Sequence, residues 1–151
     1  MNFNFWQRWL LVVSIFLVGF GLALALFNQT TFFDFLFNNQ VNPVFWKDMP
    51  LNEDAFAFQH WAYGVLGATV AGWGIFLVFV AHNPFRRKEP WAWTCLVVGV
   101  GLWYVVDTTL SLLSQVVFNA LFNTALLVLL VPPLVFTRTV FFTENHLKTD
   151  K

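Results

Sequence analysis

Long apolar stretches separated by short polar segments dominate the chain. A helix that crosses a bilayer needs about twenty mostly apolar residues. Four stretches meet this requirement, at about residues 9–27, 55–81, 91–113 and 118–138. The pattern predicts an all-α fold, an antiparallel integral membrane four-helix bundle made by a single domain of residues 1–151.

Two of these stretches carry signals that modify the prediction. Ala23-Leu24-Ala25 follows an apolar run and resembles a signal-peptide cleavage site, and cleavage there would leave three spans. The apolar run continues to Phe27, which favours a retained span. Pro132-Pro133 lies inside the fourth stretch and predicts a kink, or the end of its regular part, because proline has no amide hydrogen.

The basic residues predict the orientation. If the N-terminus is cytoplasmic, Lys47 alone among the eight lysines and arginines is external. Loops rich in Lys and Arg stay on the cytoplasmic side, so both termini are predicted to be cytoplasmic. We therefore expect an integral protein of a bacterial cytoplasmic membrane. The cytoplasmic basic residues are Arg8, Arg86, Arg87, Lys88, Arg138, Lys148 and Lys151.

The external segment between the first two spans is too long for a simple connection and is rich in phenylalanine. Thr31 and Asp34 have the spacing of a helix cap, which predicts a short interfacial helix over residues 31–38. Asn42-Pro43 and Met49-Pro50 predict turns. The segment either anchors the chain in the outer leaflet, which its composition favours, or covers the outer end of the bundle.

Composition supports the membrane assignment. Apolar residues make up 58% of the chain, charged residues 11%, and the mean hydropathy is +0.65. Soluble domains contain about 45–50% apolar and about 25% charged residues. These values exclude a disordered chain and a nucleic-acid binder. The single cysteine, Cys95, excludes a disulfide scaffold.

The third span contains one charged residue, Asp107. An acidic side chain inside a span is costly and indicates function by default. Polar residues near the outer ends of three spans are predicted to meet it at one depth. They are Gln59, His60 and Tyr63 in the second span, Tyr104, Thr108 and Ser111 in the third, and Asn119 and Asn123 in the fourth. The same residues would also suit a hydrogen-bond network that serves only helix packing.

Three functions are compatible with this polar layer. The favoured one is binding of an apolar or amphipathic small molecule or lipid in an outer-leaflet pocket around Asp107. The candidate ligand-binding residues are Asp107, His60, Tyr63, Tyr104, Ser111, Asn119 and Asn123. One alternative is an accessory subunit of a larger membrane complex. The other is a lipid- or isoprenoid-modifying enzyme with Asp107 and His60 as an acid–base pair.

Small residues supply a candidate contact surface. Gly64, Ala68 and Gly72 recur at four-residue spacing, which allows helices to approach closely. This row serves either packing within the bundle, which we favour, or a homo- or hetero-oligomer. The three histidines are spread over different depths, so we expect no haem, no metal site and no other cofactor.

Overall fold

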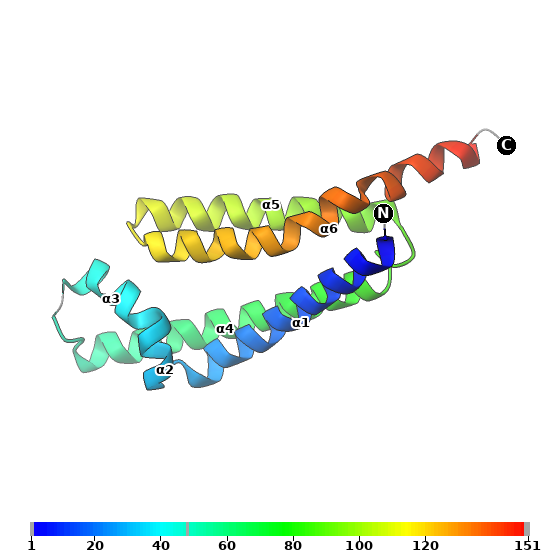
Figure 1. The fold of residues 1–151 in the computed structure, drawn as a ribbon. Coiled ribbons are helices and arrows are strands. Elements are labelled where there is room, and N and C mark those ends of the chain that lie inside the picture. Colours follow the sequence, from blue (N-terminus) through cyan, green and yellow to red (C-terminus); the bar gives the residue numbers. More distant parts are fainter. Residues whose placement is uncertain (1, 48, 150–151) are drawn as a thin grey trace.

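The structure is a computed structural model that describes residues 2–47 and 49–149, and within these ranges it is helical with no strand (Figure 1). Its elements are α1 Phe3–Phe27, α2 Thr31–Phe33, the π-helical turn η1 Asp34–Asn38, α3 Asn39–Trp46, α4 Glu53–His82, α5 Pro90–Leu113 and α6 Val117–Thr149. The helices α1, α4 and α5, and residues 117–143 of α6, are long and apolar enough to cross a membrane. This confirms an all-helical chain with four apolar helices and suggests a membrane protein.

Local sequence signals account for where the long helices begin. The side chains of Asn2 and Asn52 accept hydrogen bonds from the Phe5 and Ala55 amides and cap α1 and α4. Pro90 occupies the first position of α5, where its missing amide hydrogen leaves no bond unmade. The spans predicted at 55–81 and 91–113 therefore lie within a few residues of the bounds of α4 and α5. The other two spans are shorter than their helices, because α1 begins well before residue 9 and α6 continues past residue 138 to Thr149.

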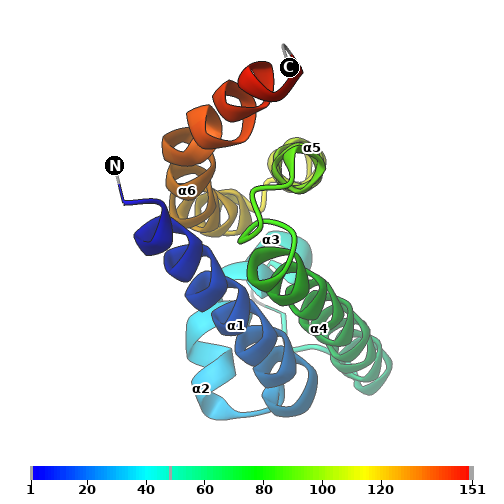
Figure 2. The same ribbon diagram turned by 90° about the vertical axis from the view of Figure 1, so that its right-hand side faces the viewer.

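The four long helices form two antiparallel pairs. α4 packs along α1, α5 packs along α6, and α1 contacts α6, while α4 and α5 share no extended contact within the described residues. Figures 1 and 2 show the α5–α6 pair lying above the α1–α4 pair. The pairs meet at the end that holds the N-terminus and separate toward the end that holds α2 and α3 (Figure 1).

The buried core holds the pairs together at the N-terminal end. Phe85, in the connection between α4 and α5, is fully buried and lies between two other phenylalanines. Its ring centroid is 5.8 Å from that of Phe3 and 4.8 Å from that of Phe141. Leucines and alanines of all four long helices continue this core toward the middle of the bundle.

Glycine allows the backbones of α1 and α4 to touch. A Cβ atom built on Gly21 would lie 2.3 Å from the Ala71 nitrogen, and one on Gly67 would lie 2.4 Å from the Ala25 nitrogen. Neither position has room for a side chain. By contrast, a Cβ on Gly72 would meet nothing within 4 Å. Close packing therefore uses the row that contains Gly67 and Ala71, which lies beside the predicted row of Gly64, Ala68 and Gly72.

The predicted row of Gly64, Ala68 and Gly72 does not lie at the close contact between α1 and α4. Ala68 and Gly72 are exposed, and a Cβ on Gly64 would approach only the Ala25 carbonyl oxygen, at 4.0 Å. The expectation that this row packs inside the bundle is wrong for Gly72. Its role in an oligomer stays a prediction.

Pro132 and Pro133 bend α6 but do not end it. The helix continues past them (Figure 1). Pro133 cannot donate to the carbonyl oxygen of Leu129, four residues earlier. The indole Nε1 of Trp9 on α1 donates to that oxygen instead, at 2.9 Å. The carbonyl that the proline leaves without an amide partner thus joins α6 to α1.

The segment between α1 and α4 is more helical than its sequence predicts. α2, η1 and α3 follow one another without a break from Thr31 to Trp46, so the turn predicted at Asn42-Pro43 is wrong. The capping side chain is Thr30 rather than Thr31, and its hydroxyl accepts from the Phe33 amide. Lys47, in the left-handed backbone region, ends α3.

Candidate functional site

A cavity of about 640 Å³ occupies the space between the two helix pairs, at the end where they separate. We call it the Asp107 pocket. Its walls come from every described helix. They consist of Leu17, Phe20 and Leu24 of α1; Phe33, Phe37, Val41 and Phe45 of the α2–α3 segment; Tyr63, Leu66, Thr69, Val70 and Trp73 of α4; Trp103, Asp107, Leu110 and Ser111 of α5; Ser114 and Val116 of the following turn; and Phe118, Asn119, Phe122, Asn123 and Leu126 of α6.

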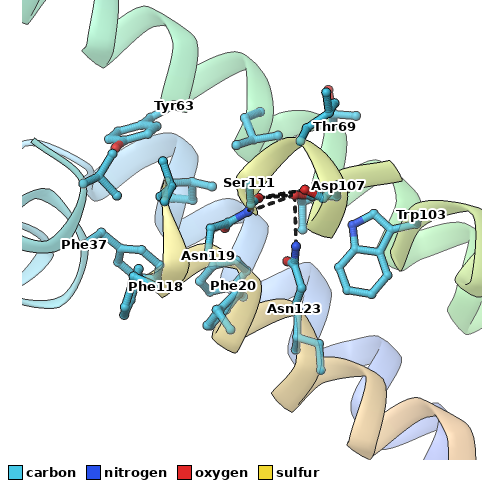
Figure 3. Close-up of a pocket in the computed structure, with 18 of the residues that line it drawn as sticks. Phe20, Phe37, Tyr63, Thr69, Trp103, Asp107, Ser111, Phe118, Asn119 and Asn123 are labelled. Carbon is cyan, nitrogen blue, oxygen red and sulfur yellow. Dashed lines mark hydrogen bonds between the residues drawn. The ribbon is translucent and has the colours of Figure 1, made fainter. Parts of the chain in front are cut away.

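Asp107 lies at the polar side of this pocket (Figure 3). Its Oδ1 accepts hydrogen bonds from Asn119 Nδ2 at 2.8 Å and Asn123 Nδ2 at 3.0 Å. The Ser111 hydroxyl donates to the Asp107 backbone carbonyl at 2.7 Å, lies 3.2 Å from Oδ1, and accepts from Asn119 at 2.7 Å. Two side-chain amides thus converge on one carboxylate oxygen, with a hydroxyl beside them.

The sequence builds this network from two helices and one tight turn. Asp107 and Ser111 are one helical turn apart on α5, and Asn119 and Asn123 are one turn apart on α6. Between the helices, the Val116 amide donates to the Ser111 carbonyl and the Gln115 amide to the Leu112 carbonyl. These two bonds define a Schellman motif, which reverses the chain within a few residues. The reversal brings Asn119 beside Ser111.

Phenylalanines of the α2–α3 segment form the wall opposite Asp107's own helix. Phe33, Phe37, Val41 and Phe45 follow one another at four-residue spacing and all line the pocket. Phe37 lies among three other rings, with centroid distances of 5.9 Å to Phe20, 5.5 Å to Phe118 and 5.6 Å to Phe122. The segment therefore forms part of the cavity wall.

Other phenylalanines of the same segment point away from the pocket. Phe32 and Phe35 are exposed and do not line the cavity. The segment thus has two apolar faces, one toward the pocket and another toward the surroundings.

Two tryptophans close the pocket toward the core. Trp73 is the lining residue of α4 nearest the N-terminal end of the bundle, and Trp103 holds the same position on α5. Their ring centroids are 5.6 Å apart. They connect α4 to α5 where these helices otherwise make little contact.

The pocket opens sideways between α4 and α5. Leu66 on α4 and Leu110 on α5 both line it, yet they are 51% and 59% exposed. Side chains that line a cavity and also reach the outer surface mark its rim. In a membrane such a rim faces lipid.

The structure brings together five of the seven predicted site residues. Tyr63 lines the pocket that holds Asp107, Ser111, Asn119 and Asn123 (Figure 3). Tyr104 does not line it, and its hydroxyl lies 3.2 Å from that of Thr124. His60 does not line it either.

His60 belongs to a second polar cluster, beside the end of α1. Its Nδ1 lies 2.5 Å from the side-chain oxygen of Asn28, which is buried and caps α1 by donating to the Leu24 carbonyl. Within the described residues no hydrogen bond joins His60 to Asp107. The predicted acid–base pair therefore does not form in this structure.

Sequence reasoning missed most of this second cluster. Gln59 is buried and donates to the side-chain oxygen of Asn42, at 2.6 Å. Asn38 is buried and donates to Asp34, also at 2.6 Å. Asparagines in an otherwise apolar segment could have indicated this cluster, because buried polar side chains usually have hydrogen-bond partners. The cluster ties the α2–α3 segment to α4.

No metal centre is visible in the described part of the chain, where no three histidine, cysteine, aspartate or glutamate side chains gather. Comparison of the chain with protein-family models, with curated proteins and with solved structures found no match.

Proposed function

We propose that this chain is an integral membrane protein that binds an amphipathic small molecule or lipid in the Asp107 pocket. The observation that carries the proposal is a cavity of about 640 Å³ with apolar and aromatic walls and a single carboxylate. Known ligand sites are mostly apolar cavities of about 300–1,000 Å³ with a few placed polar groups. The sideways opening would admit a molecule directly from the lipid.

The distribution of basic residues supports an orientation with both termini in the cytoplasm. The connection between α4 and α5 contains Arg86, Arg87 and Lys88, and such loops remain cytoplasmic. The α2–α3 segment then lies on the external side, at the membrane interface. Asp107 would lie about 9 Å from the external end of α5, at 1.5 Å per residue.

Single cysteines test this orientation. In a Cys95→Ser background, cysteine placed at Gln40 in α3 should react with a membrane-impermeant maleimide in intact cells. Cysteine placed at Asn83 should react only after the membrane is permeabilised. The reverse pattern would refute the orientation without affecting the pocket.

Filling the pocket tests the binding function. Val70 lines the pocket, whereas Val65 on the same helix is 49% exposed and does not. The wild-type protein, extracted in mild detergent, should show a bound molecule of a few hundred daltons by native mass spectrometry. Val70→Trp should lose this mass and Val65→Trp should keep it. Equal masses in the two variants, or none in the wild type, would refute the proposal.

A second candidate function, an accessory subunit of a larger complex, is favoured by the outward-facing Gly72. A Cβ there would meet nothing within 4 Å, so the position is free to receive another helix. Gly72→Leu should then abolish co-purification of a partner and leave the chain folded. The enzymatic alternative receives less support, because His60 lies outside the Asp107 pocket.

A further inference from the structure

We propose that the ligand of the Asp107 pocket is a cationic amphiphile, with a protonated amine head group beside Asp107 and a hydrocarbon body along the aromatic walls. This inference rests on the proposed binding function and specifies its ligand class. It is carried by the hydrogen bonding of Asp107, the charge of the lining and the chemistry of the walls.

The two oxygens of Asp107 have different surroundings. Oδ1 accepts from the side-chain amides of Asn119 and Asn123 and lies 3.2 Å from the Ser111 hydroxyl. Oδ2 accepts no hydrogen bond from any described residue. A carboxylate oxygen has lone pairs for more than one donor, so Oδ2 retains its full accepting capacity. The two amide donors also fix the orientation of the carboxylate, as a preformed site requires.

No lysine or arginine among the described residues lines the pocket to balance Asp107. It is the only lining residue that carries a formal charge, and the described lysines and arginines all lie outside the lining. An acidic side chain within a membrane usually pairs with a positive group. A ligand that brings its own positive charge would complete the pair, and an ammonium would also donate a hydrogen bond to Oδ2.

The walls favour the same head group. Nine of the lining side chains are aromatic, and Trp103 stands one helical turn from Asp107 on the same helix (Figure 3). The face of an aromatic ring attracts a cation, most strongly for tryptophan. An anionic head group would be repelled by Asp107. A neutral hydroxyl head group would gain the hydrogen bond to Oδ2. It would gain neither the ionic attraction to Asp107 nor the attraction of a cation to the aromatic rings.

Three probes with the same twelve-carbon chain separate these head groups. Dodecylamine, dodecanol and dodecanoate are titrated separately into the purified chain in mild detergent, with bound ligand counted by native mass spectrometry. Dodecylamine should bind at least tenfold more tightly than dodecanol, and dodecanoate should bind most weakly. Dodecanol binding as tightly as dodecylamine would overturn the head-group proposal.

Variants assign the preference to Asp107. Asp107→Asn keeps the side-chain shape and should lose most of the preference for dodecylamine over dodecanol, leaving only the part that the aromatic walls supply. Its retained dodecanol binding would show that the pocket is folded. Leu110→Lys should reduce the amine preference by placing a competing cation at the rim, and Leu110→Gln should not. An amine preference as large in Asp107→Asn as in the wild type would refute the role of the carboxylate.

The design separates failure of this inference from failure of the proposed function. If Val70→Trp abolishes binding of all three probes but the wild type shows no amine preference, the pocket binds ligand and the head-group assignment is wrong. If Val70→Trp binds every probe as the wild type does, the probes do not occupy the pocket and both proposals fail.

Discussion

Replacing Gly67 with alanine should destabilise the protein, although alanine is the better helix former. The Cβ of the new side chain would lie 2.4 Å from the Ala25 nitrogen and 2.6 Å from the Gly21 carbonyl oxygen. Ordinary Cβ contacts begin near 3.4 Å. Both neighbouring atoms belong to the α1 backbone, so no flexible side chain can move aside. The difference between 3.4 and 2.4 Å means that α1 and α4 must separate by about 1 Å.

Gly72 gives the matched control on the same helix, because a Cβ there meets nothing within 4 Å. Both substitutions gain the helix propensity of alanine, about 1 kcal/mol in water. Only Gly67→Ala carries the cost of overpacking, about 1–3 kcal/mol. The free energies of unfolding of the two variants should therefore differ by about 1–3 kcal/mol, with Gly72→Ala at or above the wild type.

Reversible unfolding measures this difference. Each variant is titrated with sodium dodecyl sulfate in mixed micelles, and loss of helix is followed by circular dichroism. Gly67→Ala should unfold at a lower detergent fraction than Gly72→Ala. Coincident curves would show that the backbone contact between α1 and α4 does not limit stability, and would refute the assignment of these helices as a close-packed pair.

Two further substitutions test the bend of α6 and the turn before it. Trp9→Phe removes the donor to the Leu129 carbonyl and should cost about 1 kcal/mol in the same unfolding titration. The cost should shrink in a Pro133→Ala background, where that carbonyl regains an amide partner, and an unchanged cost would contradict this account. Gln115 has a φ of 63°, so Gln115→Gly should stabilise the chain by up to about 1 kcal/mol. Gln115→Val should destabilise it, and two effects of the same sign would refute the strain argument.

The bounds of α4 and α5 could be predicted because local chemistry sets where these helices begin. Asn52 caps α4 through its own side chain, and Pro90 suits only the first turn of a helix. Both helix starts can therefore be recognised in the sequence. The start of α1 could not be predicted from hydropathy. Gln7 is polar, yet it is buried within the helix because its side chain donates to the Ala81 carbonyl of α4.

The candidate site was predictable in part, for a related reason. Asp107 and Ser111 share a helix face by their spacing, as do Asn119 and Asn123, and a tight turn must bring the two faces together. His60 lies at a similar predicted depth but finds its partner on α1. Depth along a helix follows from counting residues, whereas the direction of a side chain depends on which helices pair, and that is decided by packing.

The choice of pairs explains why a cavity exists at all. Gly21 and Gly67 bring α1 and α4 into backbone contact, while α4 and α5 share no extended contact within the described residues. The pairs meet at the end where Phe85 is buried and separate toward the end that holds α2 and α3 (Figure 1). The network at Oδ1 of Asp107 lies within the α5–α6 pair alone. A ligand could therefore enter or leave between the pairs without breaking these bonds, and the site would stay formed whether or not it is occupied.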